Sequence, residues 1–114
     1  MSSKIRKKTD DLGINKISKH IFICCDAKDD KCINRNEGLK SWNYLKKRLA
    51  ELDLAGKGGV QRTKADCFRI CSKGPIIAVY PDNIWYHSCD TDFVEKIIQK
   101  HIIKGKPLKK RRIN

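Results

Sequence analysis

With 114 residues and a mass of 13.1 kDa, the chain suits one small domain and excludes an enzyme with separate cofactor and substrate domains. Its apolar runs are far shorter than the roughly 20 residues of a membrane-spanning helix, so we expect no transmembrane segment. No apolar stretch with a cleavage site follows the basic N-terminus, so we expect no signal peptide and a cytoplasmic protein. The net charge of +13 suits anionic partners.

The positive charge is concentrated at the two ends of the chain. Residues 1–19 carry six basic and two acidic side chains, and residues 104–114 carry six basic and no acidic ones. Such blocks repel themselves and bury little surface, so flexible basic tails are predicted at 1–19 and 107–114, around a domain at 20–106. Nucleic acid is not an expected partner, because the basic stretches lack the interleaved aromatic residues on which bases stack.

Between the ends, the residue pattern predicts the order strand, helix, strand, strand, strand, helix. Strands are predicted where β-branched and aromatic residues cluster, and helices where apolar residues recur at steps of three and four. The predicted strands are 20–25, 60–64, 76–80 and 84–87, and the predicted helices are 39–52 and 91–102, the second beginning at Thr91 or Asp92. This order predicts an α/β fold with a small mixed β-sheet of about four strands covered by two helices.

Four of the six cysteines lie in or beside polar loops that follow predicted strands. Cys24 ends the first strand and Cys32 lies in the next loop, whereas Cys67 and Cys71 share the loop of residues 66–74. Such loops can converge at one edge of a sheet and bring four thiolates together. The spacings C-x7-C and C-x3-C match neither zinc knuckles nor plant-type ferredoxins. On spacing alone, a zinc site, an iron–sulfur cluster, a redox dithiol and no site at all stay open.

The other two cysteines and the histidines are expected to pack rather than to bind a metal. Neighbouring residues of a strand point to opposite faces, so Cys25 points away from the site if Cys24 faces it. Cys25 and Cys89 are therefore predicted to be small buried hydrophobes, the alternative being that one of them replaces a ligand. The histidines, expected to be packed or exposed, are His20, His87 and His101.

One set of motifs is specific enough to suggest a family. It consists of His20-Ile-Phe-Ile-Cys24, then Cys32, then Cys67-Phe-Arg-Ile-Cys71-Ser-Lys-Gly-Pro, an apolar strand, Tyr80-Pro81 and Trp85-Tyr86. Over roughly residues 20–106 the chain resembles the thioredoxin-like [2Fe-2S] ferredoxins, and among them it is most similar to cyanobacterial ferredoxin-domain proteins. The resemblance implies a thioredoxin-like fold and one [2Fe-2S] cluster. The implied ligands are Cys24, Cys32, Cys67 and Cys71, with Cys25 as the alternative to Cys24.

The resemblance also implies one-electron transfer, so a carrier and not an enzyme is expected. Amides of residues 69–74 are expected to donate hydrogen bonds near the cluster. The basic tails suit an acidic redox partner, and the family often forms homodimers. The alternative is a structural zinc protein whose tails bind nucleic acid or an acidic partner. A thiol–disulfide oxidoreductase is disfavoured because the chain has no C-x-x-C, and a fold that has lost its cluster is disfavoured by the four matching cysteines.

Overall fold

A mixed four-stranded sheet forms the centre of the protein. The computed structural model describes residues 3–25, 35–55, 59–70 and 73–114. The strands are β1 (Lys19–Cys24), β2 (Val60–Ala65), β3 (Ile76–Tyr80) and β4 (Ile84–Tyr86). Their order in the sheet is β2-β1-β3-β4, with β1 parallel to β2 and antiparallel to β3, and β3 antiparallel to β4. The predicted mixed sheet is confirmed, and every strand end lies within one residue of its expected position.

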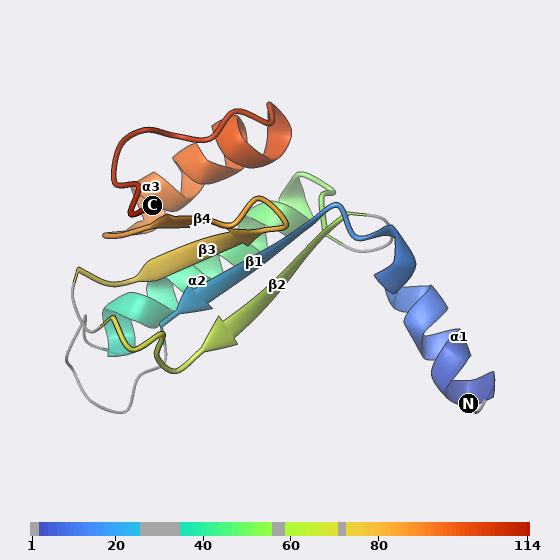
Figure 1. Cartoon of the computed structure of the whole chain (residues 1–114). Coiled ribbons are helices and arrows are strands. Elements are labelled where there is room, and N and C mark those ends of the chain that lie inside the picture. Colours follow the sequence, from blue (N-terminus) through green and yellow to red (C-terminus); the bar gives the residue numbers. More distant parts are fainter. Residues whose placement is uncertain (1–2, 26–34, 56–58, 71–72) are drawn as a thin grey trace.

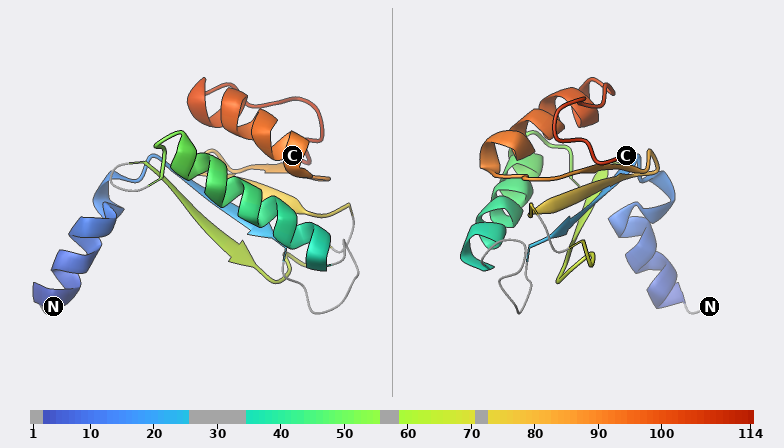
Figure 2. Two further views of the ribbon diagram at one scale, coloured as in Figure 1. Left: turned by 180° about the vertical axis from the view of Figure 1, so that it is seen from behind. Right: turned by 60° about the vertical axis from the view of Figure 1, so that its left-hand side comes forward.

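Two helical segments lie on one side of this sheet (Figures 1 and 2). The first is α2 (Arg35–Glu51), and the second is α3 (Thr91–Lys96), which continues as the π-helical segment η2 (Ile97–Ile103). α2 begins four residues before the predicted start at 39, because its first turn is polar and lies outside the apolar repeat. α3 is capped by Asp90 rather than by Thr91 or Asp92, since the Asp90 carboxylate accepts a hydrogen bond from the Phe93 N–H at 2.9 Å.

The core lies between the sheet and these helices. Ile21 and Ile23 of β1 stand opposite Val79 and Ile77 of β3, and all four are fully buried. Burying side chains of this kind stabilises the fold by roughly 1.5–3 kcal/mol each. The even-numbered residues of β1 point to the other face of the sheet, as the alternation of a strand requires. That second face therefore receives Cys24, whereas Cys25 belongs to the core.

The N-terminal residues form a helical extension that packs little against the sheet. α1 (Ser3–Leu12) and the short 3-10 helix η1 (Ile14–Lys16) extend away from the strands (Figure 1), and neither has a buried residue. The segment is thus outside the core, as expected of a tail, but it is helical. Lysine and arginine are good helix formers, which accounts for the helix.

The C-terminal residues differ from the predicted flexible tail. The Ile113 N–H donates to the Trp85 carbonyl at 2.8 Å, and the His87 N–H donates to the Arg111 carbonyl at 2.9 Å. Together with an antiparallel bridge between Tyr86 and Arg112, these bonds lay the C-terminal segment along β4. β4 is an edge strand whose free backbone groups need partners, and the segment supplies them. The residue pattern alone gives no sign of such a pairing.

A charged cluster joins the two covering helices. Arg48 of α2 donates to the Glu95 carboxylate through Nε at 2.7 Å and Nη2 at 3.1 Å, and the Tyr44 hydroxyl donates to the same carboxylate at 2.8 Å. The Arg48 and Glu95 side chains are each 26% exposed. Chiefly through the Arg48 hydrogen bonds, this arrangement lowers the pKa of Glu95 to about 2.

Replacing Glu95 by glutamine is expected to lower the free energy of unfolding by about 1–2 kcal/mol at pH 7, because Arg48 loses its charged partner. The folded pKa lies below the ordinary value of 4.5, so the stabilisation is complete above that value and is lost as the pH falls from 4.5 toward 2. In urea unfolding, the difference between wild type and Glu95→Gln should be constant from pH 7 to about 5 and narrow below that. Glu51→Gln is the control. Glu51 is more exposed than Glu95, and its contact with Arg48 is longer, at 3.5 Å. Equal effects of the two substitutions would contradict this account.

Candidate metal centre

Cys24 lies at the edge of the sheet where two predicted loops leave it. β2 runs parallel to β1 and ends beside Cys24 at Ala65, and β3 begins beside it at Ile76. The loop after β1 and the loop between β2 and β3 therefore start from the same edge. This is the convergence that the sequence predicts for the two cysteine-bearing loops.

Cys24 is held inside the protein, with a backbone amide directed at its sulfur. The side chain is 5% exposed. The backbone N–H of Ile76 donates to Cys24 Sγ at 3.2 Å. A hydrogen bond donated to sulfur favours the negatively charged form, which is the form that binds metal.

Cys67 lies two residues beyond the end of β2 and is exposed. The Arg69 N–H donates to Cys67 Sγ at 3.0 Å, as expected of the amides in this loop. Arg69 has a φ of 66°, in the left-handed region that residues other than glycine seldom adopt. The turn at Arg69 thus directs a backbone amide at the sulfur of Cys67.

The structure brings two of the four predicted ligands to one edge and does not describe the other two. Cys32 and Cys71 lie outside the described residues. Among residues 3–25, 35–55, 59–70 and 73–114, no group of three His, Cys, Asp or Glu side chains is placed to hold a metal ion. The described part of the site therefore consists of Cys24, Cys67 and the two backbone amides that bind their sulfurs. The Ile76 amide carries no side-chain signal, so sequence reasoning missed it.

Cys25 and Cys89 are buried, as predicted. Cys25 is 2% exposed and belongs to the hydrophobic core, and Cys89 is fully buried. Burial raises the pKa of the Cys89 thiol far above its ordinary value, with a smaller contribution from the neighbouring Cys24. Cys89 is therefore an inert, protonated thiol at neutral pH.

The histidines have partners of their own. His20 stacks on the Phe22 ring at a centroid distance of 4.2 Å, and His87 Nδ1 lies 2.9 Å from the Ser88 hydroxyl. His101 is fully buried, with Nδ1 2.9 Å from the Tyr86 hydroxyl and Nε2 2.6 Å from Asp82. Burial lowers the pKa of His20. These contacts agree with the prediction that the histidines pack.

No helix in the described parts of the chain is both long and apolar enough to cross a membrane. A scan against protein-family models finds no match. The chain is 33% identical over 99 residues to "Ferredoxin, 2Fe-2S" of Clostridium pasteurianum, which covers 82% of this chain and 94% of that protein. It is 26% identical over 97 residues to "Ferredoxin, 2Fe-2S" of Aquifex aeolicus, covering 81% of this chain and 86% of that protein.

A solved structure agrees with the observed fold. The crystal structure of the wild-type thioredoxin-like [2Fe-2S] ferredoxin from Aquifex aeolicus matches with a TM-score of 0.71 and 22% sequence identity. The match covers 84% of this chain and 96% of that one. This likeness confirms the predicted thioredoxin-like fold.

Proposed function

The chain belongs to the thioredoxin-like [2Fe-2S] ferredoxin family, and from this premise we propose that it binds one [2Fe-2S] cluster and carries single electrons between proteins. The observation that carries the proposal is the sheet edge at which Cys24 and Cys67 lie, each sulfur accepting a backbone N–H hydrogen bond. Such a protein is an electron carrier and not a catalyst. The zinc-binding alternative finds no support among the relatives reported above.

As ligands we propose Cys24, Cys32, Cys67 and Cys71. The family motif supports all four positions, and the meeting of the two loops at one edge supports Cys24 and Cys67 in particular. Cys25 is the weaker alternative to Cys24, because it lies in the core on the helix side of the sheet.

When bound by four thiolates, a [2Fe-2S] cluster accepts one electron, and its net charge changes from about −2 to about −3. The chain supplies groups that offset this charge: the N–H donors of Arg69 and Ile76, and the cationic side chains of Arg69 and Lys73 in the same loop. Buried Cys24 and exposed Cys67 lie at one edge, so this site is shielded on one side and open to a partner on the other.

The redox partner is proposed to be acidic, since the chain carries a net charge of +13. We retain residues 20–106 as the cluster domain and add to it the C-terminal segment that pairs with β4. A cytoplasmic location stays a prediction. So does a homodimer, for which sedimentation equilibrium should give twice the chain mass of 13.1 kDa.

A reductive titration tests the electron-carrier proposal. Anaerobic protein is titrated with dithionite while its visible absorption is followed. We expect bleaching that is complete after one electron per chain. Uptake of two electrons without bleaching would indicate a disulfide that is reduced to a dithiol, and it would contradict the proposal. No uptake of electrons at all would contradict it too.

A further inference from the structure

We propose that an acidic redox protein docks on a basic surface formed jointly by the loop after β2 and the C-terminal segment. This docking surface consists of Arg69, Lys73, Arg111 and Arg112, together with the exposed Ile70 that follows Arg69 in the sequence. The inference rests on the proposed function, because docking here serves a cluster held at the Cys24 and Cys67 edge.

Aromatic packing makes the first link between the loop and the C-terminal segment. Phe68, next to Arg69, packs edge-on against the Trp85 ring of β4 at a centroid distance of 5.3 Å. The Trp85 carbonyl accepts the hydrogen bond from the Ile113 N–H, next to Arg112. Arg69 and Arg112, 43 positions apart in the sequence, thus approach the same residue of β4 from two sides.

A second link runs through Ser88. Its N–H donates to the Lys73 carbonyl at 2.6 Å, and its own carbonyl accepts a hydrogen bond from Arg111 Nη1 at 2.8 Å. The Arg111 guanidinium lies 4.7 Å from the centre of the Phe93 ring, and Asp90 at 3.5 Å offsets part of its charge. Lys73 and Arg111 are therefore held close together by the backbone of one residue.

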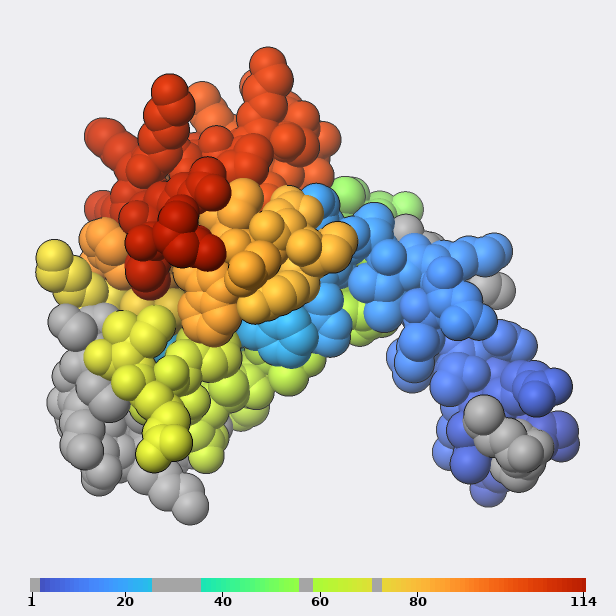
Figure 3. Space-filling view, viewed as in Figure 1, coloured from blue at the N-terminus to red at the C-terminus, as the bar shows by residue number. Residues whose placement is uncertain are grey.

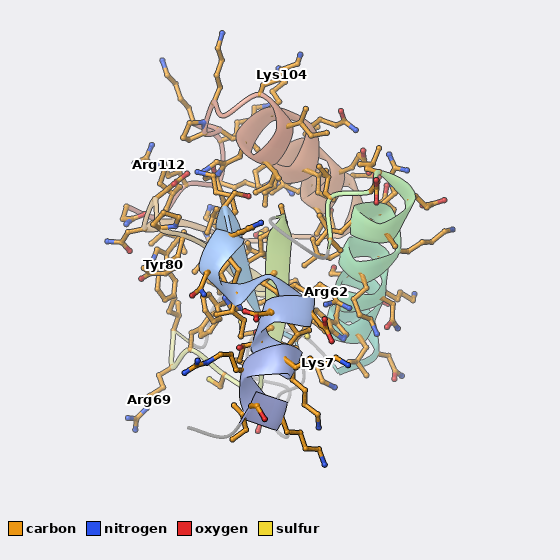
Figure 4. All side chains as sticks on the ribbon, turned by 90° about the vertical axis from the view of Figure 1, so that its right-hand side faces the viewer. Lys7, Arg62, Arg69, Tyr80, Lys104 and Arg112 are labelled. Atoms are coloured by element: carbon orange, nitrogen blue, oxygen red, sulfur yellow. The ribbon has the colours of Figure 1, made fainter. Side chains whose placement is uncertain are left out.

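The figures show the same arrangement. In Figure 3 the dark red C-terminal segment lies against the orange β3–β4 hairpin, with the yellow residues that follow β2 on the hairpin's other side. In Figure 4, Arg69 and Arg112 lie on one side of the molecule with Tyr80 between them. α1 extends from the opposite end of the sheet (Figure 1). Arg69 and Lys73 thus flank the cluster edge and Arg112 lies further along the same side, whereas the cations of α1 are at the opposite end of the sheet.

The surface suits a protein better than a nucleic acid. Ile70, next to Arg69 in the sequence, is 40% exposed, and an exposed apolar residue beside charged ones is typical of a protein interface. Phe68, Tyr80 and Trp85 pack edge to face, with interplanar angles of 70° and 79°. Rings packed edge to face bind one another and do not form the row of parallel platforms on which successive bases stack.

The test compares two double variants with the same change of net charge. Arg69→Glu with Arg112→Glu reverses two charges of the docking surface. The control, Lys7→Glu with Lys104→Glu, reverses two exposed charges on α1 and at the end of η2, both away from it. Each reduced protein is mixed in a stopped-flow instrument with ferric EDTA, an anion, or with hexaamminecobalt(III), a cation. One electron passes from the reduced cluster to the acceptor, giving ferrous EDTA or cobalt(II).

We expect the Arg69/Arg112 variant to react roughly three- to tenfold more slowly than wild type with ferric EDTA at low salt, and faster with hexaamminecobalt(III). Both differences should vanish at about 0.5 M salt, because exposed charges are then screened within a few ångströms. The Lys7/Lys104 control should stay within about twofold of wild type, since its charges lie far from the reacting edge. Equal changes of the reaction rate in the two double variants would show that net charge alone sets the rate, and this result would overturn the inference.

A competition experiment decides the class of partner. At equal total charge, an oligoglutamate peptide should slow the oxidation of wild type by ferric EDTA more than a single-stranded oligothymidylate does. Stronger inhibition by the oligothymidylate would overturn the choice of an acidic protein. If both variants show the visible bands of a cluster and react with the acceptors at equal rates, the docking surface is refuted and the proposed function stands. If the wild type shows no such bands, the proposed function is refuted as well.

Discussion

Replacing Cys67 by alanine is expected to abolish cluster binding. The iron content should fall from about two atoms per chain to a trace. Three thiolates cannot complete the four-sulfur coordination, and an exposed cluster that lacks one ligand is open to water and oxygen. Cys89→Ala is the matched control, because it removes a thiol that is fully buried and held in its protonated form. The measurement is iron and acid-labile sulfide per chain after anaerobic purification.

The same measurement separates Cys24 from its neighbour. Cys24→Ala should lose the cluster, whereas Cys25→Ala should keep it, because Cys25 lies in the core. A smaller side chain at a core position destabilises the fold by roughly 1–2 kcal/mol without removing a ligand. If Cys25→Ala loses its iron and Cys24→Ala retains it, the proposed ligand set is wrong.

Replacing Gly38 by alanine is expected to destabilise the protein by roughly 1–3 kcal/mol and to reduce its cluster content. Gly38 lies in the first turn of α2, against the backbone of Cys25. A Cβ at this position would overlap the carbonyl oxygen of Cys25 and come within 3.0 Å of its carbonyl carbon and Cα. The clash is with backbone, so the helix or the end of β1 must shift. Cys24 is the adjacent residue, and such a shift would displace its sulfur.

The expected loss of stability in Gly38→Ala is opposite to the usual effect of replacing a glycine by alanine in a helix, so the result is informative. Alanine normally stabilises a helix relative to glycine by up to about 1 kcal/mol. Asn43→Ala, at an exposed position of the same helix, is the control and should be neutral or slightly stabilising. Thermal unfolding of both variants, followed by far-UV circular dichroism, makes the comparison. A Gly38→Ala protein as stable as wild type, with full iron content, would contradict this account of the packing.

The elements that the sequence predicts best are those with a local signal. β3 was expected at residues 76–80 and is observed there. The apolar run lies between Pro75 and Pro81, and these two prolines define where the strand begins and ends. The apolar repeat from Leu39 to Leu52 predicts the body of α2. Its first turn is missed, because polar residues contribute nothing to an apolar repeat.

The features that sequence reasoning missed depend on contacts between distant residues. The C-terminal segment is a charge block by composition, and only the open edge of β4 gives it a partner. The amide that binds Cys24 comes from Ile76, 52 positions away, and a backbone donor has no side-chain signature. By contrast, the convergence of the loops after β1 and β2 could be predicted, because it follows from the direction of parallel strands alone.

The central claim is that this chain holds one [2Fe-2S] cluster. The most direct test is the visible absorption spectrum of anaerobically purified full-length protein before and after dithionite, with iron, sulfide and zinc counted in the same sample. We predict visible charge-transfer bands that bleach on reduction, together with about two irons and two sulfides per chain. A colourless protein with about one zinc per chain would contradict the claim and make this a structural metal site.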